Sequence, residues 1–350
     1  MTFQPKNDHK TFSFIDLFAG IGGFRLALES FGGTCIFSSE WDKNSQAVYE
    51  SNFDELPHGD ITRIKEENIP VHDVLCAGFP CQSFSISGKR LGFSDTRGTL
   101  FFDIARIVEY HHPKILFLEN VKNLARHDGG KTLQVILNTL KELGYDIFHK
   151  VLRSSDFGVP QARERIYLVG FRNDLNVKDF YFPDPQNESK IVKQILENVP
   201  ITDKVFINRS DIKIYGDEKA IKNIRKPLQV GIINKGGQGE RIYSIYSAGI
   251  TLSAYGGGAA SKTGAYLVSG KIRKLTPREC ARMQGFPETF ILPSNKNLAY
   301  KQFGDSVSVP VIEAIFKEII NAYGILEEKN DIILTLNGKS PRQLSFETLQ

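Results

Sequence analysis

Short apolar runs alternate with amphipathic stretches over the first 170 residues of this chain. Runs such as TFSFIDLF, TCIFSSE, DVLCA and ILFLEN have the length and composition of buried β-strands. Each run is followed by a segment with helical spacing, and the clearest of these, TLQVILNTLKELG, ends at a glycine. Such alternation predicts an α/β fold built on a doubly wound, mostly parallel sheet. Ligands bind sheets of this kind at the carboxyl ends of the strands.

The pattern changes after about residue 184. The turn-rich connector PDPQNESK leads into a stretch rich in Gly, Ser and Tyr, without clear helical spacing, that reaches about residue 270. We therefore expect a first domain at 1–195 and a smaller domain of loops and strands at 196–275. Helical spacing returns in TPRECARMQGFP and VPVIEAIFKEIINAYG, which predicts a segment at 276–330 that packs back on the first domain. Residues 331–350 form an extension with no predicted role.

Composition and charge narrow the class of protein. The 350 residues are 41% hydrophobic, but no run of about 18 apolar residues predicts a membrane span, and the polar start MTFQPKNDHK does not resemble a secretory signal. The four cysteines lack the paired spacing of metal ligands, so we expect a cytoplasmic protein without disulfides or a metal site. Between Ile201 and Lys274 the chain has 13 Lys and Arg against 5 Asp and Glu, a net charge of +8. This basic module favours a polyanionic partner, with a solvated surface as the alternative.

A glycine turn follows the first apolar run. The stretch DLFAGIGGF contains Gly20 and Gly22, and Glu40 comes 20 residues after Gly20, at the end of the second predicted strand. An acidic residue at this place commonly binds ribose hydroxyls, and the neighbouring Trp41 could stack on an adenine ring. A dinucleotide is one candidate ligand, although its G-x-G-x-x-G fingerprint would need glycine where the chain has Arg25. S-adenosylmethionine needs the same ribose and adenine contacts without a pyrophosphate.

One cysteine stands apart from the others. Cys81, in GFPCQSFS, directly follows a predicted strand and a proline, so its sulfur is expected to face the ligand crevice. A reachable and activated thiol is a nucleophile, and an inert small apolar side chain is the alternative. Cys76, inside the apolar run, is expected in the core. The glycine-containing loop after Cys81 suits closure over a substrate and contacts to phosphate, with candidate residues Ser85, Ser87, Lys89 and Arg97.

Further polar side chains lie at predicted strand ends. Glu119 follows the apolar run ILFL, where a carboxyl group is expected to be partly buried and able to donate as well as accept a hydrogen bond. Arg163 and Arg165 are two residues apart and so share one face of an extended segment. Two like charges there favour an anionic ligand or a carboxylate, with ion pairs to Glu164 as the alternative.

These pieces together resemble the DNA (cytosine-5)-methyltransferase family. The matching stretches are DLFAGIGGF, EWD, GDI, GFPCQSFS, LFLENV, QARER, LTPRECARMQGFP and QFGDSVSVP, in the family's order over residues 12–320. The stretch from NKGGQGERIYS to KTGAYLV is similar to the recognition domain of bacterial modification enzymes specific for GCGC. The resemblance implies the S-adenosylmethionine-dependent methyltransferase fold and duplex DNA as partner. It further implies a monomer that protects host DNA from a restriction endonuclease.

The resemblance also implies roles for the polar residues. The thiolate of Cys81 would add to C6 of a flipped-out cytosine, so that C5 can attack a sulfonium methyl group. Glu119 would contact N3 and the exocyclic amine, and Arg165 would support O2. Arg163 would hold the pocket and a nearby phosphate.

Cofactor and DNA contacts follow from the same resemblance. Asp305 stands where many relatives have asparagine. Arg241 would read guanine, with a phosphate contact as the alternative. Ser87 and Gln238 would fill the space left by the flipped base, and Tyr255, Gly256 and Gly257 would approach the bases. The implied cofactor residues are Phe18, Gly20, Gly22, Glu40, Trp41, Asp60, Ile61 and Pro80, with Asp305, Ser306 and Val307 on the methionine side.

Three other functions remain compatible with the sequence. An RNA cytosine methyltransferase of the same fold would transfer methyl groups to transfer RNA instead of duplex DNA. A catalytically inactive relative would bind DNA without transfer. A nicotinamide oxidoreductase would bind a dinucleotide.

Overall fold

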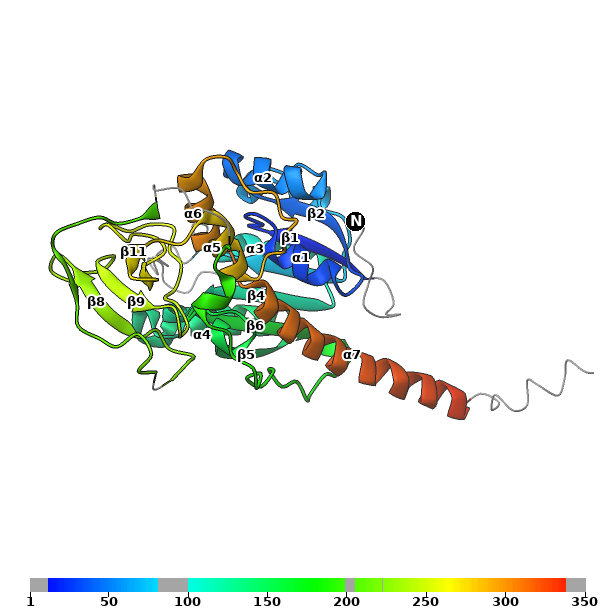
Figure 1. The fold of residues 1–350 in the computed structure, drawn as a ribbon. Helices are drawn as coiled ribbons and strands as arrows, with labels where there is room; N and C mark the ends of the chain where they lie inside the picture. Colours follow the sequence, from blue (N-terminus) through cyan, green and yellow to red (C-terminus); the bar gives the residue numbers. More distant parts are fainter. Residues whose placement is uncertain (1–11, 81–99, 199–204, 222, 338–350) are drawn as a thin grey trace, which may run out of the picture.

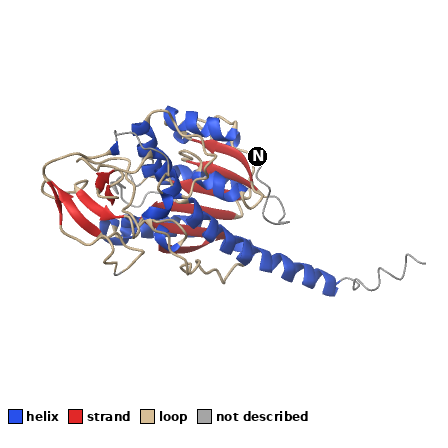
Figure 2. Ribbon diagram, viewed as in Figure 1, coloured by secondary structure: helices blue, strands red, loops and turns tan. Residues whose placement is uncertain are grey.

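Two β-sheets organise the chain (Figure 1). The computed structural model describes residues 12–80, 100–198, 205–221 and 223–337, with 325–337 as backbone only. One sheet is formed by strands from the first half of the chain, and the other by strands from the basic region. Figure 2 shows these two groups of strands separated by loops and helices.

The first sheet has six strands in the order β2-β1-β3-β4-β6-β5. Neighbouring strands from β2 to β4 pair in parallel, and β6 is antiparallel to both of its neighbours. The prediction of a doubly wound, mostly parallel sheet is therefore confirmed. The strands are β1 (Ser13–Leu17), β2 (Thr34–Ser39), β3 (Val74–Gly78), β4 (Ile115–Val121), β5 (Tyr145–Arg153) and β6 (Glu164–Arg172).

The strand order reverses beside β1, which lies between β2 and β3. The connections from the two sides therefore leave a crevice at the carboxyl ends of β1 and β3, where open α/β sheets bind ligands. The helices of this part are α1 (Gly23–Glu29), α2 (Lys43–Phe53), α3 (Leu100–His111) and α4 (Lys131–Glu142). Three buried thiols, Cys35, Cys76 and Cys280, are free, and Cys76 is fully enclosed in the core as expected.

The second sheet has five strands in the order β11-β10-β9-β8-β7. It lies at one end of the molecule, away from the first sheet (Figure 1). Its core is small and aliphatic, with Val230, Ile233 and Ile242 buried together. All its strands fall inside the expected 196–275 interval, although the exact domain boundaries stay predictions. The strands are β7 (Ile212–Ile214), β8 (Gln229–Ile233), β9 (Arg241–Ser244), β10 (Ala265–Val268) and β11 (Lys271–Arg273).

The chain then returns to the first sheet through α5 (Pro277–Gln284), α6 (Lys296–Asp305) and α7 (Val309–Asn337). Helix α5 begins with a capping box between Thr276 and Glu279. Helix α7 packs on α1, and its predicted apolar face is buried at Val311, Ile312, Ile315, Phe316 and Ile319, with Ile320 half-buried.

Two features of this return differ from the sequence expectation. Helix α6 was not predicted. Helix α7 runs past the expected boundary at residue 330, because the apolar run DIILTL continues it to Asn337. Figure 1 shows this C-terminal part of α7 extending beyond the body of the molecule. Within the described part of the chain, every helix is too short or too polar to cross a bilayer.

Candidate functional site

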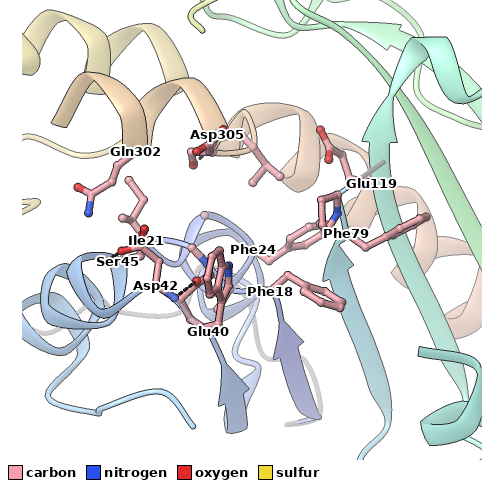
Figure 3. Close-up of a pocket in the computed structure, with 18 of the residues that line it drawn as sticks. Phe18, Ile21, Phe24, Glu40, Asp42, Ser45, Phe79, Glu119, Gln302 and Asp305 are labelled. Carbon is pink, nitrogen blue, oxygen red and sulfur yellow. Dashed lines mark hydrogen bonds between the residues drawn. The ribbon is translucent and has the colours of Figure 1, made fainter. Parts of the chain in front are cut away.

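A cavity of about 760 Å³ opens at the carboxyl ends of β1, β3 and β4. Its volume lies in the range of small-molecule sites. Figure 3 shows Glu40 and Phe18 on one side, Asp305 and Gln302 on the opposite side, and Glu119 beside Phe79. The structure thus brings together residues predicted from separate motifs. Those that line the cavity are Phe18, Gly20, Glu40, Trp41, Asp60, Ile61, Pro80, Glu119, Arg163, Arg165, Tyr255, Asp305, Ser306 and Val307.

The glycine turn adopts left-handed backbone conformations. Phe18 and Gly20 each have a φ of +56°, and Gly22, the N-cap of α1, has a φ of +85°. A Cβ atom on Gly22 would lie 2.2 Å from Cε2 of Phe53, whereas one on Gly20 would meet nothing within 4 Å. Gly22 does not line the cavity and is required for packing on α2, so its contact with a cofactor stays a prediction.

This difference gives a prediction for two matched variants. Gly22→Ala and Gly20→Ala both place a side chain at a left-handed φ, but only the first forces Phe53 to move. We expect Gly22→Ala to lower the free energy of unfolding by about 1–3 kcal/mol more than Gly20→Ala does. Urea denaturation of both variants measures the difference. Equal losses would contradict the packing role of Gly22.

Glu40 stabilises the glycine turn through hydrogen bonds to the backbone. Its Oε2 accepts a hydrogen bond from the backbone N–H of Gly20 at 2.8 Å, and its Oε1 accepts one from the N–H of Asp42 at 2.7 Å. Burial raises the pKa of the Glu40 carboxyl group, while these backbone hydrogen bonds act in the opposite direction. Because an ionised carboxylate can accept about four hydrogen bonds, Glu40 keeps capacity for a ligand hydroxyl.

Glu119 and Arg165 meet at the other end of the cavity. Strands β4 and β6 pair so that Glu119, buried at the end of β4, lies near the start of β6. Arg165 Nε lies 3.1 Å from Glu119 Oε1 and forms an ion pair with it. This Oε1 atom nevertheless has no hydrogen-bond partner among the described residues. A buried carboxyl group of this kind can still bind a polar ligand.

Arg163 is enclosed and holds the cavity wall. Its side chain is 2% exposed, and its Nη1 donates to the carbonyl oxygens of Leu252 at 3.3 Å and Gly304 at 3.1 Å. Its Nη2 donates to the carbonyl oxygen of Ser306 at 2.8 Å. Burial and the nearby Arg165 lower the pKa of this guanidinium to about 10, so it stays charged at neutral pH. Arg163 thus holds the pocket as expected, whereas its contact with a phosphate stays a prediction.

Three further residues at the site were missed by the sequence analysis. Asn120 Nδ2 donates to the carbonyl oxygen of Phe79 at 2.8 Å and so fixes the residue before Pro80. Lys301 and Gln302, both on the unpredicted α6, line the cavity. Lys301 Nζ lies 3.6 Å from Asp305 Oδ2, which supplies a cation beside this carboxylate. Of these three residues, only Asn120 could have been predicted from the sequence, because it belongs to the ENV motif.

The predicted nucleophile Cys81 lies outside the described residues, and so do four of the predicted DNA contacts, Ser85, Ser87, Lys89 and Arg97.

In the second domain, Gln238, Arg241, Tyr255, Gly256 and Gly257 are exposed. Two glycine-containing loops meet there, since a Cβ atom on Gly239 would lie 2.1 Å from the Gly257 carbonyl oxygen. The close backbone approach brings Gln238 and Arg241 next to the loop that carries Tyr255.

Comparisons with known proteins extend over most of the chain. The family model described as C-5 cytosine-specific DNA methylase matches residues 12–321. Type II methyltransferase M.HhaI of Haemophilus parahaemolyticus is 56% identical over 302 residues, which cover 86% of this chain and 92% of that protein. Type II methyltransferase M.HpaII of Haemophilus parainfluenzae is 44% identical over 348 residues, 93% of this chain and 94% of its own length. A DNMT2 mutant from Spodoptera frugiperda has a similar fold, with a TM-score of 0.69, 20% identity, and coverage of 88% of this chain and 99% of that chain.

Proposed function

Because this chain belongs to the C-5 cytosine-specific DNA methylase family, and is thereby a cytosine-5 DNA methyltransferase, we propose that it uses S-adenosylmethionine to methylate a flipped-out cytosine within duplex sites that contain GCGC. We propose that this modification protects host DNA from a restriction endonuclease of matching specificity. One observation carries the proposal. A single cavity has the glycine turn with Glu40 and Trp41 at one end and Glu119 with Arg165 at the other.

The cavity fits S-adenosylmethionine in size and chemistry. Its volume of about 760 Å³ suits a ligand of nucleoside size, and the exposed ring of Trp41 offers a stacking surface. Glu40 keeps acceptor capacity for ribose hydroxyls. Lys301 and Asp305 both line the cavity and present opposite charges beside each other, which suits the zwitterionic amino-acid end of the cofactor. When bound, S-adenosylmethionine supplies an electrophilic methyl group.

The protein's own groups would activate the cytosine. Addition of the Cys81 thiolate to C6 makes C5 electron-rich and places developing negative charge on N3 and O2 of the ring. Glu119 is suited to donate to N3 and to accept from the exocyclic amine, and Arg165 to donate to O2. Removal of the C5 proton would then expel the sulfur. Cys81 directly follows Pro80, which lines the cavity.

The second domain is proposed to read the DNA. Its net charge of +8 between Ile201 and Lys274 suits phosphate contacts. The exposed guanidinium of Arg241 can bind O6 and N7 of guanine together. Because a base inside a duplex cannot reach the cavity, the target cytosine must leave the stack, and Ser87 and Gln238 are proposed to fill its place.

The family assignment removes one of the competing functions. A nicotinamide oxidoreductase is incompatible with membership of a cytosine methylase family. An inactive DNA-binding relative and an RNA methyltransferase remain distinct outcomes of the test below.

The deciding experiment is transfer of labelled methyl groups from S-adenosylmethionine to short duplexes. Duplexes with GCGC are compared with duplexes in which one base pair of this site is exchanged, and with transfer RNA. Label at C5 of the inner cytosine of GCGC duplexes is expected. Label on duplexes without GCGC would reject the proposed specificity, and binding of DNA without any transfer would show an inactive relative.

Trp41 gives a prediction specific to the cofactor. Its side chain is 75% exposed at the cavity, so Trp41→Ala removes a stacking surface without disturbing the core. Loss of base stacking costs about 1–3 kcal/mol, which corresponds to a Kd for S-adenosylmethionine weaker by about 5- to 150-fold. Calorimetric titration measures the Kd, and the melting temperature of the free protein should not change. Tyr181→Ala, at a similarly exposed aromatic outside this lining, is the matched control. A Kd unchanged in Trp41→Ala would contradict stacking.

A further inference from the structure

The segment that leads into Arg165 is hydrogen-bonded along its length to the start of residues 249–258, which we call the recognition segment. Gly249 N–H donates to the carbonyl oxygen of Pro160 at 2.8 Å, and Ala162 N–H donates to the carbonyl oxygen of Gly249 at 2.9 Å. Thr251 Oγ1 adds a bond of 3.1 Å to the carbonyl oxygen of Ala162. Residues 160–162 and 249–251 thus run in parallel as one short ladder.

Two side chains of this segment hold a single residue, Leu252, by its backbone. Gln161 Oε1 accepts from the Leu252 N–H at 2.9 Å, and Arg163 Nη1 donates to the Leu252 carbonyl oxygen at 3.3 Å. Gln161, Arg163 and Arg165 alternate along an extended segment and so share one face. The same face therefore carries the two groups that hold Leu252 and the arginine that pairs with Glu119.

Gln161 also connects to the helices that complete the cavity. Its Nε2 donates to the carbonyl oxygen of Met283 at 3.1 Å and to Gln284 Oε1 at 2.9 Å. Gln284 Nε2 in turn donates to the carbonyl oxygens of Phe303 at 2.7 Å and Ser306 at 3.2 Å. Gln161 itself is 0% exposed, so both ends of its amide are satisfied inside the protein.

The chain after Leu252 is closely confined. A Cβ atom on Gly304 would lie 2.2 Å from the backbone nitrogen of Ala254 and 2.3 Å from the carbonyl carbon of Ser253. The next residue, Tyr255, lines the cavity, and glycines follow at 256–258. The place of Leu252 therefore sets where the recognition segment leaves the wall of the cavity.

We propose that Gln161 is a positioning residue that couples target recognition to methyl transfer, an inference that rests on the proposed function. Gln161 holds the backbone of Leu252 and the C-terminal end of α5 in fixed positions relative to each other. It thereby keeps residues 253–258 correctly placed relative to Arg165 and Glu119. A glutamine serves because it has an acceptor for the Leu252 N–H and donors for Met283 and Gln284. Displacement by about 1 Å at a reacting group is enough to change rates by about 10²-fold.

The test compares two variants of Gln161. Gln161→Met removes both the hydrogen-bond acceptor and the donors of the amide, whereas Gln161→Glu keeps the acceptor but loses the donors. Steady-state kinetics are measured on a GCGC duplex and on duplexes with one exchanged base pair, together with the Kd for S-adenosylmethionine and the melting temperature. We expect kcat on the GCGC duplex to fall by about 10- to 100-fold in Gln161→Met. The ratio of kcat/KM between the GCGC and the exchanged duplexes should fall by about 10-fold. The Kd for S-adenosylmethionine should stay within about 2-fold, because Gln161 is not part of the cavity lining.

Gln46→Met is the matched control, since Gln46 is also a buried glutamine but bonds to the backbone of Glu40. It is expected to leave the discrimination ratio unchanged. Folded Gln161 variants with a lower melting temperature but an unaltered kcat/KM ratio between GCGC and exchanged duplexes would overturn the inference. Gln161 would then contribute only to the stability of the fold. If Gln161→Met does not fold, Gln161→Glu decides in the same way. Wild-type protein without methyl transfer to any duplex would instead overturn the proposed function.

Discussion

Cys81→Ser is expected to lower the rate of methyl transfer by at least about 10³-fold while S-adenosylmethionine and DNA are still bound. A thiol is partly ionised at neutral pH and is intrinsically a strong nucleophile, whereas a hydroxyl group needs a base to activate it. The loss should appear in kcat and not in KM, because the exchange of sulfur for oxygen changes little in binding. Single-turnover transfer of labelled methyl groups to a GCGC duplex measures this rate.

A second cysteine supplies the control for this experiment. Cys76 is fully buried in β3, five residues before Cys81, and its pKa is raised by burial, so it is unsuited to act as a nucleophile. Cys76→Ala should keep the methyl-transfer rate within a few-fold of wild type, after allowance for any loss of stability. A Cys81→Ser protein that transferred methyl groups at the wild-type rate would refute the covalent mechanism.

Glu279→Ala is expected to lower the free energy of unfolding by about 3–5 kcal/mol. Arg273 and Glu279 form a two-pronged ion pair with distances of 2.7 and 2.8 Å, and their side chains are 2% and 0% exposed. Glu279 also accepts from the N–H groups of Thr276 and Glu197, both within 2.9 Å. Removing it leaves the charge of Arg273 buried without an anionic partner, at the junction of β11 and α5. Urea denaturation at neutral pH measures the loss.

An exposed ion pair with the same geometry tests whether burial causes the large loss of stability expected for Glu279→Ala. Arg209 and Asp211 also pair through two bonds, of 2.8 and 2.6 Å, but on the surface. Asp211→Ala should leave stability unchanged within error, because water solvates the arginine that remains. The double variant Arg273→Met with Glu279→Leu should recover only the part of the loss that comes from the unpaired charge of Arg273, because the N–H groups of Thr276 and Glu197 still lack their acceptor. Equal effects of Glu279→Ala and Asp211→Ala would contradict this account.

The central strands of the first sheet were predictable because they are buried on both faces. Runs such as ILFLEN are continuously apolar, which is typical of parallel strands covered by helices. Helix α6 was not predicted because its sequence, KNLAYKQFGD, has few apolar residues. Its glycine, Gly304, packs tightly against the backbone of Ser253 and Ala254, and this contact is not visible in the sequence. The run DIILTL has the composition of a strand, but it continues the preceding helix to Asn337.

The site was predictable only where the strand order brings residues together. Glu40 directly follows β2 and Glu119 lies at the end of β4. Because the carboxyl ends of these strands lie on the same side of the sheet, their common location follows from the fold. The partners of Arg163 lie 89 to 143 residues further along the chain, and no periodic pattern indicates such contacts. The same is true of Gln161, whose partners belong to α5 and the recognition segment.

The cavity is closed by opposite ends of the sequence, and this sets an order for synthesis. A Cβ atom on Gly23 of α1 would lie 2.6 Å from Cγ2 of Val307, and the rings of Phe12 and Phe316 pack 5.1 Å apart. On the ribosome, the glycine turn emerges long before α6 and α7 exist. A nascent chain therefore carries an open half-site and an uncovered apolar face on α1 until α6 and α7 are made. Affinity for the proposed cofactor therefore requires that α6 and α7 have been made, together with the contacts that complete the core.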